Sequence, residues 1–360
     1  IAGSHETIKK KYIVPAKQLT DVLDAYDIAR PGMDVMEIGT GWVHWDSIVL
    51  RNKFDCNVLL YDVWDNRSFN KFINYCSQLA DPEIRARVGF EGAINSDLMA
   101  RLIKCESLEA AYDLLGFEYL IDPSGKLGNV ADGRFDLVVS NAVFEHLRAE
   151  DTGTIIQRIH DVLRPGGWAI HLVSLQDHLK IYAKSAHIKE YLRFSKDEYN
   201  RKYQNDVQYI NLMQIPEWLT LFEASGFEVL ETRRLSGSDL SGLPVHESWR
   251  GMSEEDLACS VVQFVTRRPR EAAAEAVGVG EVGPLGDRLT PRKSFAIWQQ
   301  TVERQSVPWT EDDREMAEAA RTALLEVVMR HSEILETERQ TADVRQKVLN
   351  EELNHRVKNI

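Results

Sequence analysis

Short apolar runs alternate with helix-like segments over the first 268 residues of the chain. The runs are bounded by turn residues and lie at 34–40, 56–63, 135–141 and 168–175. Runs of this length suit strands that are buried on both faces of a parallel sheet. Helical patterns lie between them, at 17–29, 44–53 and 151–163. The alternation predicts an α/β fold with a doubly wound, Rossmann-like sheet.

Two insertions and a closing unit complete this region. Residues 218–235 read as a helix, a turn at Gly226 and a strand, and 257–268 as the last strand. The stretch 64–134 is longer than one crossover needs, and we expect it to supply a further strand at 117–121, helices at 68–80 and 95–115, and a cap over the site. A second insertion, 176–217, is rich in Tyr, Lys and Asp and is expected to form a lid.

The composition changes after residue 268. Val328, Leu335, Ala342 and Leu349 recur every seven residues, which indicates a coiled-coil seam and favours a homodimer through a partner helix. The predicted organisation is a domain at 1–268, a linker or junction at 269–283, a further segment at 284–320 and a long helix at 321–360.

Charge and residue usage exclude several classes of protein. The net charge of −13 argues against a chain whose main role is to bind nucleic acid or an anionic membrane. There is no apolar run of about 18 residues that could cross a bilayer, and the first residues have no apolar segment typical of a secretory signal. The four cysteines lack metal or redox spacing, so we expect no metal site, reduced thiols and a cytoplasmic protein.

The stretch MEIGTGW, residues 36–42, carries the strongest indication of function. A strand delivers Glu37, and Gly39-Thr40-Gly41 then turns into a helix. Glycines at such a turn let the backbone approach a ligand closely, and a helix N-terminus can face a carboxylate or phosphate. Asp62 follows Gly41 by 21 residues, at the end of the next strand, where an acid accepts ribose hydroxyls. The glycine turn and Asp62 together predict a site for a nucleoside-bearing cofactor.

The full set of motifs resembles class I S-adenosylmethionine-dependent methyltransferases. The matching stretches are EIGTGW, the acid Asp62, RFDLVVSNAVFEHL (134–147) and VLRPGGWAIHLVS (162–174). The resemblance covers about residues 30–268. Trp42 and Val43 stand where many members of the family have a third glycine.

The resemblance implies S-adenosylmethionine as the cofactor. The implied cofactor-binding residues are Glu37, Gly39, Gly41, Asp62, Val63, Ser140 and Asn141. The first three would line the methionine and ribose side, Asp62 would accept the ribose hydroxyls, and Val63 would pack on the adenine. Ser140 and Asn141 would lie beside the transferred methyl group. The acceptor is expected to be a small molecule or a glycan, since the acidic chain has no basic stripe for nucleic acid.

Methyl transfer needs positioning above all, and a base only where the nucleophile must lose a proton. Two histidines are the catalytic candidates: His146, after the fourth strand, and His178, at the start of the expected lid. His146 could instead serve to build the helix that follows its strand. His171 lies within a strand and is expected in the core. His44 could contact the cofactor tail or cap a helix.

The end of the chain resembles a different class of protein. Residues 284–320 are similar to the end of a bacteriophytochrome PHY domain, and ELNHRVKN (352–359) is similar to the phosphoacceptor box of HWE-type histidine kinases. This resemblance implies His355 as a phosphoacceptor, the alternative being an ordinary histidine on a charged helix. Kinase activity is not expected, because no ATP-binding domain follows.

Three interpretations of the whole chain stay open. One is a methyltransferase joined to a sensor-kinase fragment, as a truncated natural fusion, a chimera or an enzyme with a relic tail. The second is a signalling protein whose methyltransferase-like domain is a ligand-binding regulatory module. The third is a methyltransferase fold that binds the cofactor but is catalytically inactive.

Overall fold

The computed structural model describes residues 8–90, 95–183, 185–204 and 209–270. These residues belong to the first of two compact units, Ile1–Glu275. The predicted segment at 284–320 and the long helix lie outside the described residues, as does most of the predicted linker.

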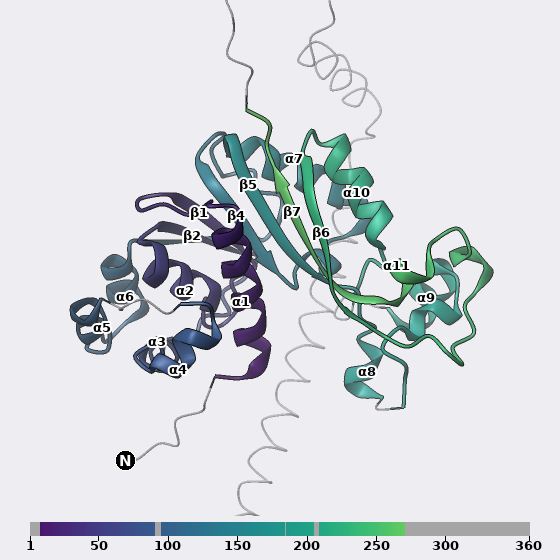
Figure 1. Ribbon diagram of the computed structural model, residues 1–360, viewed down its shortest axis with the longest axis horizontal. Helices are drawn as coiled ribbons and strands as arrows, with labels where there is room; N and C mark the ends of the chain where they lie inside the picture. Colours follow the sequence, from purple (N-terminus) through teal and green to yellow (C-terminus); the bar gives the residue numbers. More distant parts are fainter. Residues whose placement is uncertain (1–7, 91–94, 184, 205–208, 271–360) are drawn as a thin grey trace, which may run out of the picture. The chain divides into compact units, whose positions relative to one another are not determined.

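One sheet of seven strands forms the centre of the domain, in the order β3-β2-β1-β4-β5-β7-β6 (Figure 1). Strand β7 is antiparallel to both of its neighbours, and the other pairs are parallel. The predicted α/β fold is confirmed, with a mixed rather than wholly parallel sheet. The strands are β1 Asp34–Ile38, β2 Asn57–Asp62, β3 Phe117–Ile121, β4 Phe135–Asn141, β5 Leu163–Ser174, β6 Glu228–Gly237 and β7 Cys259–Arg267.

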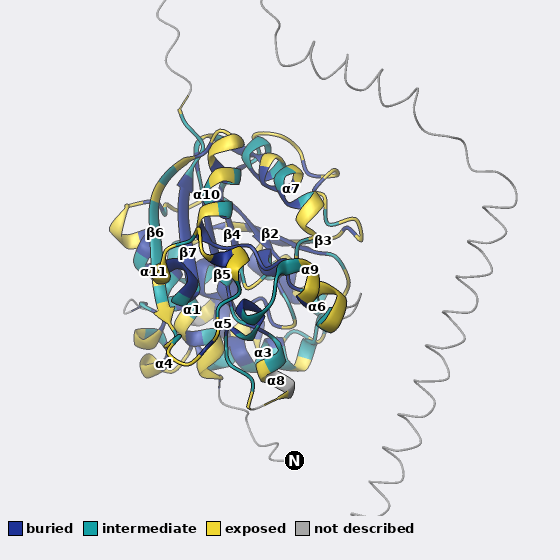
Figure 2. Ribbon diagram, turned by 90° about the vertical axis from the view of Figure 1, so that its right-hand side faces the viewer, coloured by how far each residue is buried: buried dark blue, intermediate teal, exposed yellow. Residues whose placement is uncertain are grey.

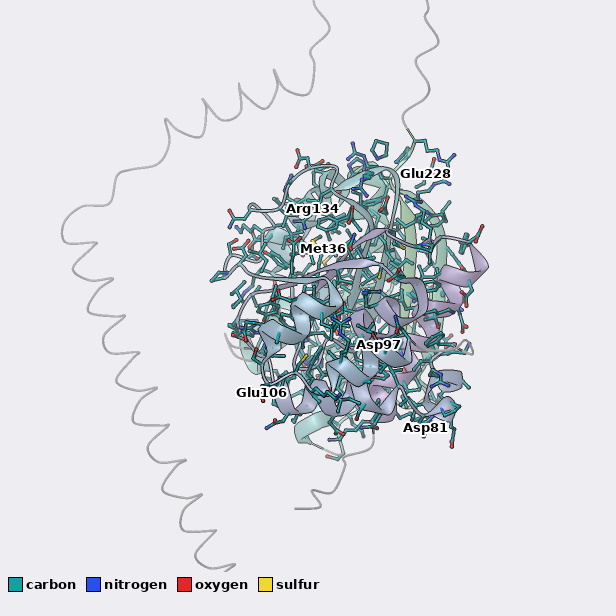
Figure 3. The ribbon with its side chains drawn as sticks, turned by 90° about the vertical axis from the view of Figure 1, so that its left-hand side faces the viewer. Met36, Asp81, Asp97, Glu106, Arg134 and Glu228 are labelled. Atoms are coloured by element: carbon teal, nitrogen blue, oxygen red, sulfur yellow. The ribbon has the colours of Figure 1, made fainter. Side chains whose placement is uncertain are left out.

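Helices cover both faces of this sheet because successive strand residues point to opposite sides. Val35 belongs to the hydrophobic cluster shared with α1 and α2, and the next residue, Met36, to the cluster shared with α7 and α10. Figure 3 labels Met36 within the body of the domain, and Figure 2 shows the dark blue strands enclosed by partly exposed helices. The helices are α1 Lys10–Ala25, α2 Trp45–Phe54, α3 Phe69–Gln78, α4 Pro82–Arg87, α5 Ser96–Leu102, α6 Leu108–Leu115, α7 Ala149–Val162, α8 Leu179–Tyr182, α9 Lys196–Tyr203, α10 Ile215–Ala224 and α11 Glu254–Ala258. In the described part of the chain, no helix has the length and apolar character that a membrane span requires.

The largest differences from the predicted boundaries are at the starts of α1 and β5, and the predicted helix at 95–115 is divided into α5 and α6. Helix α1 begins at Lys10 rather than 17 and runs through Pro15. Ile13 and Ala16 on this added stretch are buried in the core, and that burial offsets the hydrogen bond that Pro15 cannot donate. Strand β5 begins at Leu163 rather than 168. Arg164, the second residue of the strand, forms ion pairs with the carboxylates of Asp34 and Asp136, each at 2.7 Å.

The first insertion supplies β3, as predicted at 117–121, together with α3 to α6, which pack on the α1 side of the sheet. The second insertion contains α8, α9 and the 3-10 turn Glu190–Arg193. Its side chains form a separate cluster in which Tyr191 and Tyr199 pack with Trp249 and Leu257. This insertion therefore shares a small core with the segment between β6 and β7. Its predicted role as a lid stays a prediction.

A buried lysine joins that insertion to the sheet. Lys189 is fully buried, and its Nζ donates to the carbonyl of Leu175 at 3.0 Å and to the Tyr191 hydroxyl at 2.8 Å. Among the described residues it forms no ion pair with a carboxylate. Burial lowers the pKa of Lys189 to about 7.

We expect this lysine to make stability depend on pH. Between pH 7 and the ordinary lysine pKa, the unfolded chain holds a proton that the folded chain does not, so stability rises with pH by about 1.4 kcal/mol per unit. Urea unfolding of the full chain and of Lys189→Met, followed by tryptophan fluorescence, should show the difference growing in favour of the wild type as pH rises from 7 to 9. Lys104→Met, at an exposed position, is the control. Parallel pH profiles for wild type and Lys189→Met would contradict the assignment.

Candidate active site

A cavity of about 560 Å³ lies at the edge of the sheet where β1 and β4 end. Because parallel strands end at a common edge, the loops after β1, β2 and β4 come together there. The lining residues are Lys9, Lys11, Tyr12, Glu37, Gly39, Thr40, Gly41, Trp42, Val43, Trp45, Asp46, Lys71, Tyr75 and Asn141. Four of the seven predicted cofactor residues therefore share one cavity: Glu37, Gly39, Gly41 and Asn141.

The loop after β1 depends on its two glycines. Gly39 and Gly41 have φ angles of +71° and +62°, a region that side chains with a Cβ rarely adopt. A Cβ at Gly39 would lie 2.4 Å from a methyl group of Val143, in the loop after β4. The N–H of Gly39 donates to the carbonyl of Tyr61 at 2.8 Å. The loop is thus held closely between the ends of β2 and β4.

Asp62 holds this loop through hydrogen bonds from its backbone. Its carboxylate is buried and accepts hydrogen bonds from the backbone N–H of Gly41 at 3.2 Å and of Val63 at 2.8 Å. Burial raises the pKa of Asp62. Asp62 and Val63 do not line the cavity itself, and the Val63 side chain lies near Gly125. The structure thus brings Asp62 to the predicted loop, with backbone donors already on the carboxylate.

Two more buried carboxylates lie on the cavity wall. Glu37 accepts from the Ser47 N–H at 3.1 Å and from the Ser47 hydroxyl. Asp46 accepts from the side-chain amide of Asn141 at 3.2 Å, and its Oδ1 is buried with no hydrogen-bond partner among the described residues. Burial raises the pKa of both acids, and the charge of Asp46 raises that of Glu37 further. Such a pair attracts a positively charged group.

The Ser140 side chain forms its hydrogen bond inside the protein core. Its hydroxyl lies 2.8 Å from Nδ1 of His171, and both residues are buried. The His171 ring stacks on Phe144 with centroids 4.1 Å apart, and burial lowers the pKa of His171 to about 3. His171 is therefore a core residue, as predicted. Ser140 lies at the end of β4 as expected, but its hydroxyl faces this histidine.

His44 is also buried. Its Nε2 lies 2.6 Å from the Tyr112 hydroxyl, and burial lowers its pKa to about 4. The residue precedes α2 with a left-handed backbone, but its side chain forms no capping hydrogen bond. It does not line the cavity. The structure therefore supports neither of the roles considered for His44.

The two predicted catalytic histidines lie together outside this cavity. The rings of His146 and His178 have centroids 5.1 Å apart, and His146 is exposed whereas His178 is half-buried. His146 Nδ1 lies 3.0 Å from the carbonyl of Tyr209. The loops that carry them follow β4 and β5, which are neighbours in the sheet. The predicted phosphoacceptor, His355, lies outside the described residues.

Sequence reasoning missed several lining residues. Asp46 lies in the first turn of α2, close to the glycine loop in sequence, and that proximity was an available signal. Tyr12 and Tyr75 come from α1 and α3, and no spacing links them to the loop. Lys71 lies over the ring of Trp42 at 4.3 Å, and Trp42 is 55% exposed. The indole of Trp42, just before the position of the family's third glycine, therefore forms part of the rim.

We expect Gly39→Ala to destabilise the fold by about 2–5 kcal/mol, combining left-handed backbone strain with overpacking against Val143. Gly32→Ala is the matched control, because Gly32 has a similar φ of +77° and open space around its Cβ position. The control should lose only about 1–2 kcal/mol from strain. Chemical denaturation of both variants measures the difference, and equal losses would show that Val143 does not constrain the loop.

Comparisons with known proteins find matches in two separate parts of the chain. The family described as methyltransferase domain matches residues 12–232, and the phytochrome region family matches residues 277–333. A curated bacteriophytochrome from Pseudomonas aeruginosa is 42% identical over 59 residues, which are 16% of this chain and 8% of that protein. The chain therefore spans a small fraction of that relative's length.

The matches among solved structures include two methyltransferases, both at low identity and low TM-score. An S-adenosylmethionine-dependent methyltransferase from Mesorhizobium loti is 15% identical, with a TM-score of 0.41, and the match covers 71% of this chain and all of that one. The 1,6-didemethyltoxoflavin-N1-methyltransferase of Burkholderia thailandensis, solved with its substrate and S-adenosylhomocysteine, is 18% identical with a TM-score of 0.38, over 72% of this chain and 79% of its own.

The family assignment rests on the match to residues 12–232, which is more than half of the 360 residues. It spans the glycine loop, Asp62 and strands β1 to β5. The predicted resemblances to methyltransferases and to the phytochrome region are confirmed. The predicted resemblance of residues 352–359 to a histidine-kinase phosphoacceptor box stays a prediction. The chain belongs to the methyltransferase domain family, and its residues 277–333 are similar to the phytochrome region family.

Proposed function

We propose that this protein is an S-adenosylmethionine-dependent methyltransferase that acts on a small-molecule acceptor. The observation that carries the proposal is the cavity at the carboxyl edge of the sheet, which combines a close glycine loop with two buried carboxylates. Its volume of about 560 Å³ lies within the range of small-molecule sites, roughly 300–1,000 Å³.

The residues of the cavity fit this cofactor. S-adenosylmethionine carries a sulfonium and an ammonium, and it supplies an activated methyl group when bound. Glu37 and the unpaired Oδ1 of Asp46 would face these cations. Asp62, next to Gly41, would accept the ribose hydroxyls. Ionised Glu37 and Asp46 become favourable once a cation lies beside them, which offsets the cost of burying two acids.

The protein's part in the reaction would be mainly to position the acceptor. Asn141, hydrogen-bonded to Asp46 at the end of β4, would orient a group next to the transferred methyl. Where the acceptor must lose a proton, His146 or His178 would accept it, because both lie on loops that follow the neighbouring strands β4 and β5. A sensor role is the second candidate, favoured by the phytochrome region at 277–333, with the methyltransferase domain acting as a ligand-binding module.

The cofactor site is tested by calorimetry of S-adenosylmethionine binding to the full chain. We expect saturable binding, which Asp62→Ala weakens about tenfold or more, since a hydrogen bond to a charged group contributes roughly 1.5–3 kcal/mol. Asp65→Ala is the matched control, because that exposed carboxylate pairs with Arg67 on the same loop. A folded chain that binds no cofactor, or equal affinities for both variants, would argue against the proposal. Binding without methyl transfer to any acceptor would favour the sensor role.

Cofactor affinity should also depend on pH. Burial raises the pKa of Glu37 and Asp46 above the ordinary range of carboxyl groups, so they take up protons as pH falls toward mildly acidic values. Protonation removes their attraction for the cationic cofactor, and we expect affinity to fall as pH is lowered from 8 to 6. Asp46→Asn should bind more weakly at pH 8 and show a flatter profile in calorimetry. If the wild type and Asp46→Asn had identical pH profiles, Asp46 would not take part in binding the cationic cofactor.

A further inference from the structure

A second group of functional side chains lies beyond the cavity, after β4 and β5. Glu145 and His146 belong to the 3-10 turn Phe144–His146, just after β4, and His178 lies between β5 and α8. Since β4 and β5 pair in parallel, their following loops meet at the same edge of the sheet. One ligand atom from each of the three residues lies within 4.8 Å of the other two.

Glu145 is a buried acid whose carboxylate is only partly hydrogen-bonded. Its side chain is 4% exposed, and its Oε2 has no hydrogen-bond partner among the described residues. In the same part of the chain, no lysine or arginine forms an ion pair with it. A buried carboxylate without a cation is costly. A positive ion beside Oε2 would offset that cost.

The histidines are arranged as metal ligands are. The Nδ1 of His146 faces the carbonyl of Tyr209 at 3.0 Å, and a carbonyl can only accept, so Nδ1 carries the proton. The lone pair of His146 then lies on Nε2, which is free to bind an ion. Metal-binding histidines characteristically donate their other N–H to a backbone carbonyl or carboxylate in this way. His178 is half-buried next to His146, with ring centroids 5.1 Å apart.

We propose that Glu145, His146 and His178 form a binding site for a divalent transition-metal ion such as zinc. Two imidazoles and one carboxylate are a ligand set that zinc, cobalt and iron(II) accept in proteins. Three protein ligands leave a coordination position open for water or for an oxygen of another molecule. The sequence prediction of no metal site rested on cysteine spacing, and these ligands come from two separate loops instead.

The position of this group relates it to the cavity. Val143, two residues before Glu145, is the side chain that packs against Gly39 of the glycine loop. The segment that carries Glu145 and His146 therefore borders that loop. An ion there would lie on the β4–β5 side, where the proposed acceptor would approach. Metal binding itself does not depend on the proposed methyl transfer, but a histidine that binds the ion cannot at the same time act as the proton acceptor proposed above.

Titration of the metal-free full chain with Co²⁺, followed by its visible absorption and by calorimetry, tests the site. We expect saturable binding with nitrogen-ligand absorption bands. Glu145→Gln, His146→Gln and His178→Gln should each weaken binding by at least about tenfold, the scale at which even indirect partners of a metal site act. Zn²⁺ should displace Co²⁺ from the wild type.

His246→Gln is the matched control. His246 lies 3.8 Å from the carboxylate of Glu198 but has no third ligand among the described residues, so it should leave Co²⁺ affinity unchanged. Circular dichroism of the metal-free variants checks their folding, and the exposed His146 is the substitution least able to disturb it. Absence of saturable binding to the wild type would overturn the proposal. So would affinity that His146→Gln leaves unchanged, since the ion would then bind elsewhere in the chain.

Discussion

The hydrogen bond between the Gly41 N–H and the Asp62 carboxylate joins the ends of the first two strands, and the candidate site depends on it. Strands β1 and β2 run in register up to Ile38 and Tyr61, and the Gly39 N–H continues that ladder onto the Tyr61 carbonyl. Val143 fills the space that a side chain at Gly39 would need. The end of β4 is thereby fixed against the same loop, so three strands together determine the shape of one cavity wall.

Acidic side chains are concentrated at this edge of the sheet. Glu37, Asp46, Asp62 and Glu145 are all buried there, and burial raises the pKa of each. Asp46 and Glu145 each keep a buried oxygen without a partner among the described residues. Proteins tolerate such uncompensated acids mainly at functional sites, where a ligand supplies the missing charge. One cationic cofactor and one metal ion would together account for these acids.

Much of the fold was predictable because the apolar runs and the glycine turns are local signals. The strand at 117–121, the turn at Gly226 and the glycine loop were all identified correctly. The start of α1 was not, because Pro15 reads as a helix break whereas burial of Ile13 and Ala16 decides the outcome. The pairing of Asp46 with Asn141, and of His146 with His178, links residues that only the sheet topology brings together. Such contacts have no signature in a single sequence.

A crystal structure of the full chain with S-adenosylhomocysteine would show whether the carboxyl edge of β1 and β2 is the cofactor site. We expect the ribose hydroxyls on Asp62, the amino group of the homocysteine beside Glu37 and Asp46, and the homocysteine chain along Gly39 and Gly41. A ligand bound elsewhere would contradict this expectation. A bound ribose whose hydroxyls do not contact Asp62 would contradict it too. Asp62 would then contact only the backbone of Gly41 and Val63, and the carboxyl edge of β1 and β2 would not be the cofactor site.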